Sequence, residues 1–168
     1  MRYLFAAAML IASAAPAFAC AAGVDAIAAY AGTWDVSITH YQTKYSKPRS
    51  EHSTLRNDCW RSAGYYACNQ IVDGVSRALL VFTYDPKQNV YHSYVIPQDG
   101  SDPHKGMLLI NGSTWTYPMQ DKDGDRTVYV RVVNQWENAS TVRFRQEFSY
   151  DEKIWTVAAS GIEHKTRP

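Results

Sequence analysis

The side chains best suited to chemistry in this sequence are five histidines, at positions 40, 52, 92, 104 and 164. No helical segment holds two of them four residues apart, so the sequence lacks the paired histidines of a zincin-type metal site. His40 and His92 lie in segments whose alternation can place both side chains inside a β-structure. An inward histidine can act as a general base or orient a polar ligand group, although it is more often an interior polar residue with satisfied hydrogen bonds.

Nucleophilic catalysis and metal binding have little support in the sequence. It contains no G-x-S-x-G segment, and no serine or cysteine has a neighbouring base that can be assigned to it. Asp121, Asp123 and Asp125 resemble the start of a calcium loop, but no glutamate follows at the spacing of an EF-hand. A solvated turn is the favoured interpretation. We therefore assign no catalytic residue and no metal ligand, and whether the protein is an enzyme stays open.

Aromatic residues are the second group of candidates. The chain has 12 Tyr, 5 Trp and 5 Phe, and Tyr and Trp suit pockets that are apolar at one end and polar at the other. We expect the following residues to contact a small hydrophobic or amphipathic ligand: His40, Tyr66, His92, Tyr94, Trp115, Tyr117 and Trp155.

Three arginines allow two interpretations. Arg131, Arg143 and Arg145 lie on the polar faces of alternating segments. They would form a site for an anionic ligand if those faces pointed inward, and they would be solvated if the faces pointed outward. The outward orientation is favoured.

Charge and length restrict the class of protein. The 168 residues carry 17 Lys+Arg against 16 Asp+Glu, which argues against the basic surface that nucleic-acid binding requires. Residues 1–19 have the features of a secretory signal, because Arg2 precedes an apolar run too short to span a bilayer and Ala17-Phe18-Ala19 suits signal cleavage. We expect no transmembrane segment in the mature chain, and the sequence does not predict its oligomeric state.

Cysteine usage agrees with a periplasmic or secreted protein. Cys20 would follow the cleavage site directly, but residues 17 and 18 do not match a lipoprotein site, so lipid anchoring is the less favoured alternative. Cys59 and Cys68 form an even pair. If a hairpin turns at residues 63 and 64, these two cysteines lie directly opposite each other and can form a disulfide. A metal pair is the alternative, and no further cysteine supports it.

The rest of the sequence describes β-structure. Residues 20–31 form a short segment or helix that ends near Gly32, and a single domain follows at 32–168. Ten short segments, most of them alternating and bounded by Asp, Asn, Gly or Pro, are the predicted strands: 33–45, 50–60, 65–73, 77–84, 90–96, 107–110, 114–117, 126–133, 141–150 and 153–161. We expect a flexible loop over 97–106 and a hairpin at Asn111-Gly112.

Short connections force each of these strands to run antiparallel to the one before. Ten such strands have exposed edges unless the sheet closes. The predicted fold is therefore an all-β, antiparallel up-and-down barrel of about ten strands with a short N-terminal helix. A two-sheet sandwich is the alternative.

Several motifs resemble the lipocalin-like (calycin) superfamily, and more closely a group of bacterial exported β-barrels of mostly unknown function. They are the Gly32-Thr33-Trp34 entry, the segments 64–68 and 84–86, the segment 112–115 and the closing hairpin 149–156. Together they span nearly the whole mature chain. The resemblance implies a lipocalin-like barrel with an internal cavity, in which Trp34 closes one end beneath a basic side chain of the last strand. Nitrobindin, a related haem-binding barrel, uses a histidine near its C-terminal end, which makes haem at His164 a less favoured alternative.

These observations favour a non-catalytic binding protein whose cavity holds a small, largely apolar molecule. Two other classes stay open. One is a small barrel enzyme with His40 or His92 as general base, and the other is an envelope interaction protein with a filled barrel. The contents of the barrel distinguish them, because a cavity favours the binding protein and a solid core excludes it.

Overall fold

The computed structural model describes residues 23–167, so the expected signal sequence at 1–19 and Cys20 lie outside the described residues. A short 3-10 helix precedes ten β-strands. The elements are η1 (Gly23–Tyr30), β1 (Gly32–His40), β2 (Arg49–Arg61), β3 (Tyr66–Val72), β4 (Val75–Asp85), β5 (Val90–Pro97), β6 (His104–Asn111), β7 (Thr114–Asp123), β8 (Arg126–Asn138), β9 (Thr141–Ser149) and β10 (Thr156–Arg167). Gly32 joins the helix to β1 with a φ of 116°, a conformation that glycine adopts without strain.

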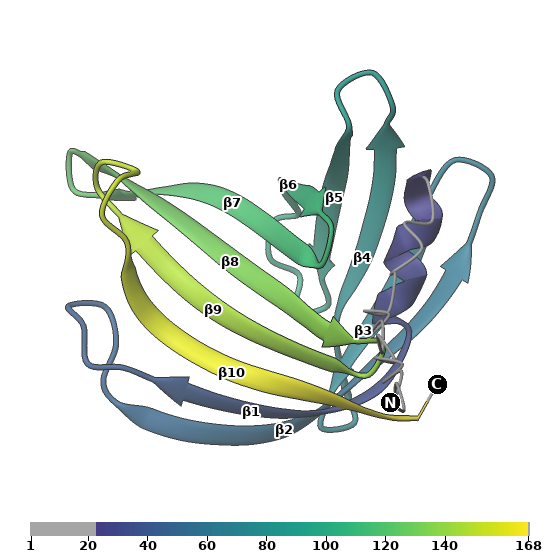
Figure 1. Cartoon of the computed structure of the whole chain (residues 1–168), viewed down its shortest axis with the longest axis horizontal. Coiled ribbons are helices and arrows are strands. Elements are labelled where there is room, and N and C mark those ends of the chain that lie inside the picture. The colour runs from purple at the N-terminus through teal and green to yellow at the C-terminus, as the bar shows by residue number, and fades with distance from the viewer. Residues whose placement is uncertain (1–22, 168) are drawn as a thin grey trace, which may run out of the picture.

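The ten strands form a closed barrel in which each strand pairs antiparallel with its neighbour in the chain (Figure 1). Pairing of β1 with β10 completes the circle. This confirms the predicted all-β, up-and-down barrel with a short N-terminal helix and excludes the two-sheet sandwich. Over residues 23–167, no helix is long and apolar enough to span a membrane.

Several strand boundaries differ from the predicted ones, since β1 already ends at His40 and β8 continues to Asn138. Strand β6 begins at His104, inside the expected flexible loop, and β7 continues through the polar segment to Asp123. The last strand runs from Thr156 to Arg167 and not over 153–161. In β6, β7 and β10, pairing with a neighbouring strand keeps polar residues in the sheet although their sequence shows no alternation of apolar and polar residues. The tertiary structure therefore overrides the local sequence pattern.

The hairpin of β2 and β3 has the predicted register. Cys59 lies opposite Cys68, Asn57 opposite Gln70 and Leu55 opposite Val72. The two cysteines form a disulfide, with their Cα atoms 4.0 Å apart. The disulfide thus joins directly opposed residues of adjacent strands.

Removing this disulfide with the double substitution Cys59→Ser and Cys68→Ser is expected to lower the melting temperature modestly and to leave a folded barrel. The bridge spans a sequence separation of 9, and closing so short a loop stabilises a chain by about 2–3 kcal/mol at most. Thermal denaturation followed by circular dichroism measures the effect. Loss of the cooperative transition would show that the barrel depends on the bridge.

Most of the buried apolar side chains gather at the end of the barrel where β1 begins. Tyr30, Trp34, Trp115 and Trp136 pack there with ring centroids 5.0 to 5.8 Å apart, and we call these four residues the aromatic floor. The helix packs beside it against β2, β3 and β4, and the side chain of its Ile27 is fully buried. Packing at this end closes the barrel.

The opposite end is open, and the wall between β6 and β7 is incomplete. These strands pair at three positions only, from Leu109–Thr116 to Asn111–Thr114. Beyond them the two strands diverge (Figure 1). Pro118 lies on the divergent part of β7, where its missing N–H is tolerated because this side of the strand is an edge.

Candidate functional site

A cavity of about 1400 Å³ occupies the barrel interior beyond the aromatic floor. Its apolar wall comes from side chains on five strands, β1, β2, β4, β8 and β9: Val36, Ile38, Leu55, Leu80, Phe82, Val130, Val132 and Phe144. Cross-strand pairing places these residues on one face of the sheet, as in Val132 opposite Gln146 and Asn134 opposite Phe144. The cavity also extends to the diverging parts of β6 and β7.

Polar groups meet at the deep end of this cavity. The hydroxyl of Tyr30 accepts hydrogen bonds from the hydroxyl of Tyr117 and from Nδ2 of Asn134, both at 3.0 Å. Helix η1 supplies Tyr30, while β7 and β8 supply the other two. Burial raises the pKa of both tyrosines well above that of an exposed tyrosine. Both phenols are therefore neutral hydrogen-bonding groups across the physiological pH range.

Glu163 is the carboxylic acid of this deep end. It lies on β10 between Val36 of β1 and Val142 of β9, and its side chain lines the cavity. Burial raises the pKa of its carboxyl from 4.5 to about 7. No hydrogen bond or ion pair joins this carboxyl to another residue within 23–167. Lys165, two residues further on β10, is engaged elsewhere, because its Nζ donates to the carbonyl oxygen of Ala29 at 3.0 Å.

The free energy of unfolding is expected to fall as the pH rises from about 4.5 to 7, because the folded state binds the Glu163 proton more tightly than the unfolded state does. The loss attributable to this residue is about 1–3 kcal/mol. Urea unfolding at pH 5 and pH 8 measures it, and Glu163→Gln should lose less stability over this range than the wild type. The same pH dependence in both proteins would contradict the assignment.

The predicted histidines lie in different environments. His40 points inward, and its Nε2 lies 3.5 Å from Oε2 of Glu51. Of these two residues, Glu51 lines the cavity and His40 does not. His92 lines the cavity, and its Nδ1 has no hydrogen-bond partner among residues 23–167. His164 is exposed and lies across the sheet from Asp35, which is also exposed.

The predicted aromatic residues are also distributed over several environments. Trp115 belongs to the aromatic floor, and Tyr117 lines the cavity directly above it. Tyr66 is buried in the hydrophobic core. Tyr94 borders the cavity but is 36% exposed, and Lys105 Nζ lies 5.9 Å from its ring centre. Trp155 borders the cavity as well, with the guanidinium of Arg131 3.8 Å from its ring centre.

The three arginines lie on the outer faces of β8 and β9. Their strand positions alternate with Val132, Phe144 and Gln146, which line the cavity. Arg131 and Arg145 both pair with the buried carboxylate of Glu147, at 2.6 and 3.0 Å. The favoured outward orientation therefore agrees with the structure, and these side chains stabilise the outer wall.

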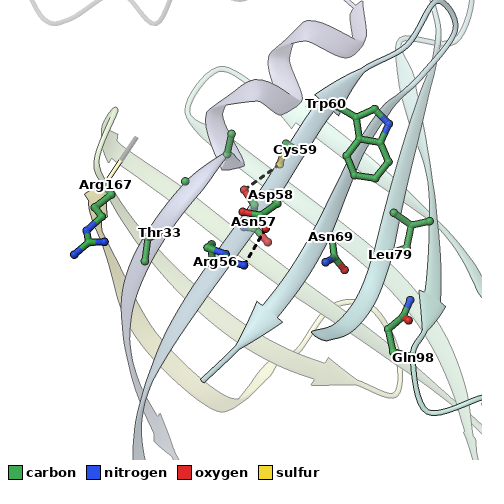
Figure 2. Close-up of a pocket in the computed structure, with 12 residues that line it drawn as sticks. Thr33, Arg56, Asn57, Asp58, Cys59, Trp60, Asn69, Leu79, Gln98 and Arg167 are labelled. Carbon is green, nitrogen blue, oxygen red and sulfur yellow. Dashed lines mark hydrogen bonds and ion pairs between the residues drawn. The ribbon is translucent and has the colours of Figure 1, made fainter. Parts of the chain in front are cut away.

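A second hollow, of about 850 Å³, lies on the outer surface near the start of β1. Figure 2 shows its side chains spread over β2, β3 and β4, among them Trp60, Asn69 and Leu79. Trp60 is 46% exposed, and Arg56 pairs with Asp58 at 3.1 Å. Because these groups are exposed and spread out, we place the candidate site inside the barrel.

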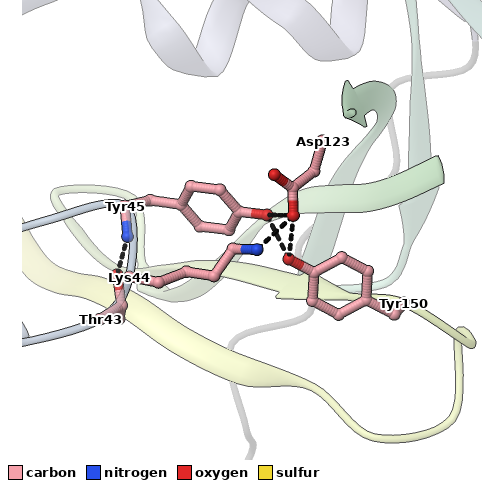
Figure 3. A network of polar contacts seen from close by, with 5 residues as sticks. All are labelled: Thr43, Lys44, Tyr45, Asp123 and Tyr150. Atoms are coloured by element: carbon pink, nitrogen blue, oxygen red, sulfur yellow. Dashed lines mark hydrogen bonds and ion pairs between the residues drawn. The ribbon is translucent and has the colours of Figure 1, made fainter. Parts of the chain in front are cut away.

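Asp123 organises the open end on the side of β7 to β10 (Figure 3). Its Oδ2 accepts hydrogen bonds from the hydroxyls of Tyr45 and Tyr150, at 3.0 and 2.8 Å, and pairs with Lys44. Lys44 and the two tyrosines lower the pKa of Asp123 to about 2. The network ties the β1–β2 loop to the strand ends beside it. Within residues 23–167, no group of three or more His, Cys, Asp or Glu side chains is arranged to hold a metal ion.

Comparison with known proteins adds no assignment. No family model matches the chain, and no curated protein matches its sequence. The closed ten-stranded antiparallel barrel is compatible with a lipocalin-like fold.

Of the polar residues at the deep end, sequence patterns indicated Tyr117 but not Tyr30, Asn134 or Glu163. Glu163 follows Ile162, and adjacent residues of a strand point to opposite faces of the sheet. Because an apolar residue is ordinarily assigned to the interior, the sequence alone predicts that Glu163 points outward. Tyr30 closes an Ala-rich segment that carries no motif. The available signal was the expected pairing of the first and last strands, which places Glu163 opposite Val36 and on the same face as Trp34.

Proposed function

We propose that this protein is an exported, lipocalin-like barrel that binds a small, largely apolar molecule in its interior and does not transform it. The observation that carries the proposal is the cavity of about 1400 Å³ above the aromatic floor. Ligand sites for drug-sized molecules occupy about 300–1,000 Å³. The interior therefore has room for a molecule of that size or for a longer chain.

The composition of the lining supports a largely apolar ligand. Aliphatic and aromatic side chains from β1, β2, β4, β8 and β9 make up much of the wall, and burying apolar surface against them contributes about 25 cal/mol per Å². Among the polar groups that line the cavity, those of Tyr30, Tyr117, Asn134 and Glu163 lie at the deep end. Such a distribution suits an elongated molecule with one polar end.

The incomplete wall supports entry from solvent. Met107 on β6 and Met119 on β7 are 44% and 46% exposed at the diverging strands, and both line the cavity. Methionine adapts to apolar surfaces of different shapes. We propose that ligands enter between these strands or through the open end of the barrel.

Export is supported by two independent features. The first 19 residues have the pattern of a secretory signal, and the Cys59–Cys68 disulfide suits an oxidising compartment. We propose a periplasmic or secreted location on these grounds.

Binding of a neutral fluorescent probe whose emission rises in apolar surroundings tests the proposal. Val132 lines the cavity, whereas its neighbour Val133 lies on the opposite face of β8. We expect saturable binding to the wild type, at least about tenfold weaker binding to Val132→Trp, and unchanged binding to Val133→Trp. Equal binding by both variants, or no binding by the wild type, would contradict a ligand site inside the barrel.

A further inference from the structure

The carboxyl of Glu163 lines the cavity and has no counter-ion among residues 23–167. Its cross-strand neighbours Val36 and Val142 are apolar. Burial is the cause of its raised pKa, and no cation among the described residues offsets that burial. A buried carboxylate without a partner is costly, and a positive charge placed beside it removes much of the cost.

The groups that face Glu163 from other elements are neutral. Tyr30 of η1 and Tyr117 of β7 are close enough for the charge of Glu163 to affect their ionisation. Lys165 is the cation nearest in sequence on the same face of β10, and its Nζ binds the carbonyl oxygen of Ala29 while lying 4.7 Å from the ring centre of Trp34. The described part of the protein therefore leaves the negative charge of Glu163 uncompensated.

The lining as a whole has an excess of negative groups. Four carboxylates line the cavity against one lysine, Lys105, and three histidines, His52, His92 and His104; the carboxylates are Glu51, Asp73, Glu152 and Glu163. Glu51 already pairs with Arg49 and His40, so Glu163 is the carboxylate of this set that is both buried and without a cation beside it. A concave site lined by one sign of charge attracts ligands of the opposite sign and repels ligands of the same sign. The amide Oδ1 of Asn57, at the deep end of the cavity, is a further buried acceptor without a partner among residues 23–167.

We propose that the ligand is a lipophilic amine, whose ammonium group pairs with the carboxylate of Glu163 while its apolar body lies against the aliphatic wall. This inference rests on the proposed function and names its ligand class. An ammonium group has hydrogens to donate and no acceptor, so it matches a deep end that offers a carboxylate. A fatty acid of the same length places a second negative charge beside Glu163 and binds more weakly.

The pairing is pH-dependent in a defined direction. A primary alkylamine stays cationic below about pH 10, as lysine does. Glu163 gains its charge as the pH rises through about 7, and the flanking tyrosines stay neutral there because their pKa values are raised. Preference for the amine over a neutral analogue should therefore be greater at pH 8.5 than at pH 6.

Displacement of the neutral probe by decylamine, decan-1-ol and decanoic acid tests the inference, with each competitor kept below its micellar concentration. At pH 8.5 the wild type should bind decylamine at least about tenfold more tightly than decan-1-ol, as expected for a hydrogen bond between charged groups. Glu163→Gln should remove this preference, so that this variant binds decylamine and decan-1-ol with similar affinity. Glu137→Gln, at an exposed position that does not line the cavity, is the matched control and should keep the preference.

The outcomes separate this inference from the proposed function. Equal affinity for the amine and the alcohol, or a preference for the amine that survives in Glu163→Gln, overturns the assigned ligand class while a binding cavity stands. Tightest binding of decanoic acid overturns it as well. Failure of the probe and of all three competitors to bind overturns the proposed function itself. The comparison of pH 6 with pH 8.5 on the wild type provides a test that does not depend on the folding of any variant.

Discussion

Replacing Trp34 with alanine is expected to lower the free energy of unfolding by about 3–5 kcal/mol, the range for truncating a large buried aromatic residue. Trp34 is 1% exposed, and its ring packs 5.8 Å from that of Trp136 in the aromatic floor. Its Nε1 donates to the carbonyl oxygen of Tyr30 at 3.0 Å. The substitution removes this hydrogen bond and leaves a void at the end of the barrel where the core is concentrated.

The effect of Trp34→Ala also reaches the last strand. Lys165 Nζ lies 4.7 Å from the Trp34 ring centre, and an interaction of a cation with an indole face contributes about 0.5–2 kcal/mol. Thermal and urea denaturation should show a melting temperature lower by roughly 10 °C. Trp60→Ala is the matched control, because Trp60 is 46% exposed on the outer face of β2. Similar losses for the two variants would show that the aromatic floor does not stabilise the barrel.

Replacing Gly161 with valine is expected to destabilise the barrel by about 3 kcal/mol or more, through overpacking. A Cβ atom at this position would lie 2.4 Å from Cζ of Phe144 and 2.4 Å from the backbone oxygen of Ser37. Phe144 is buried and lies directly across from Gly161 on β9. Backbone and ring must both shift to admit even one methyl group, and valine adds two more carbons.

Gly64→Val is the control for this substitution. No atom lies within 4 Å of a Cβ built at Gly64, so the change should cost less than about 1 kcal/mol. Urea unfolding of both variants measures the difference. A Gly161→Val protein as stable as the wild type would show that the aromatic ring of Phe144 does not require a glycine opposite it.

Gly161 also shows why close packing between distant residues is difficult to predict from the sequence. Glycine usually ends a strand or marks a close approach of the backbone, and the predicted last strand ended at this residue. In the structure it lies in the middle of β10, where the missing side chain makes room for Phe144. Whether Gly161 ends a strand or makes room for a neighbour depends on Phe144, which lies 17 positions earlier in the sequence. A local sequence pattern around Gly161 does not include that residue.

Local patterns were sufficient where adjacent strands set the geometry. The hairpin around residues 63 and 64 fixes its own register, so the disulfide and the pairing of Asn57 with Gln70 followed from counting alone. The ten strands and the up-and-down closure also followed, because short connections leave few topologies. The sequence did not predict that β6 and β7 diverge. The Asn111-Gly112 turn between them is predictable, but the number of residues that pair beyond this turn is not.

The candidate site was predicted less completely than the fold. Trp115 and Tyr117 were expected to contact a ligand, and the structure places both at or near the deep end of the cavity. Tyr30 and Glu163 were not expected, although they meet Tyr117 there. The inward direction of Glu163 is set by the register of β10 against β1. That register pairs the first strand with the last, which are far apart in the sequence, so no local sequence pattern reports it.

Native mass spectrometry of the protein, purified from its source cells without detergent, tests the central claim most directly. The proposed function predicts a population that carries a bound small molecule, whose mass is lost on denaturation and is absent from Val132→Trp but present in Val133→Trp. A protein that shows the mass of the bare chain under all conditions, and that also fails to bind the neutral probe, would contradict a ligand-binding interior.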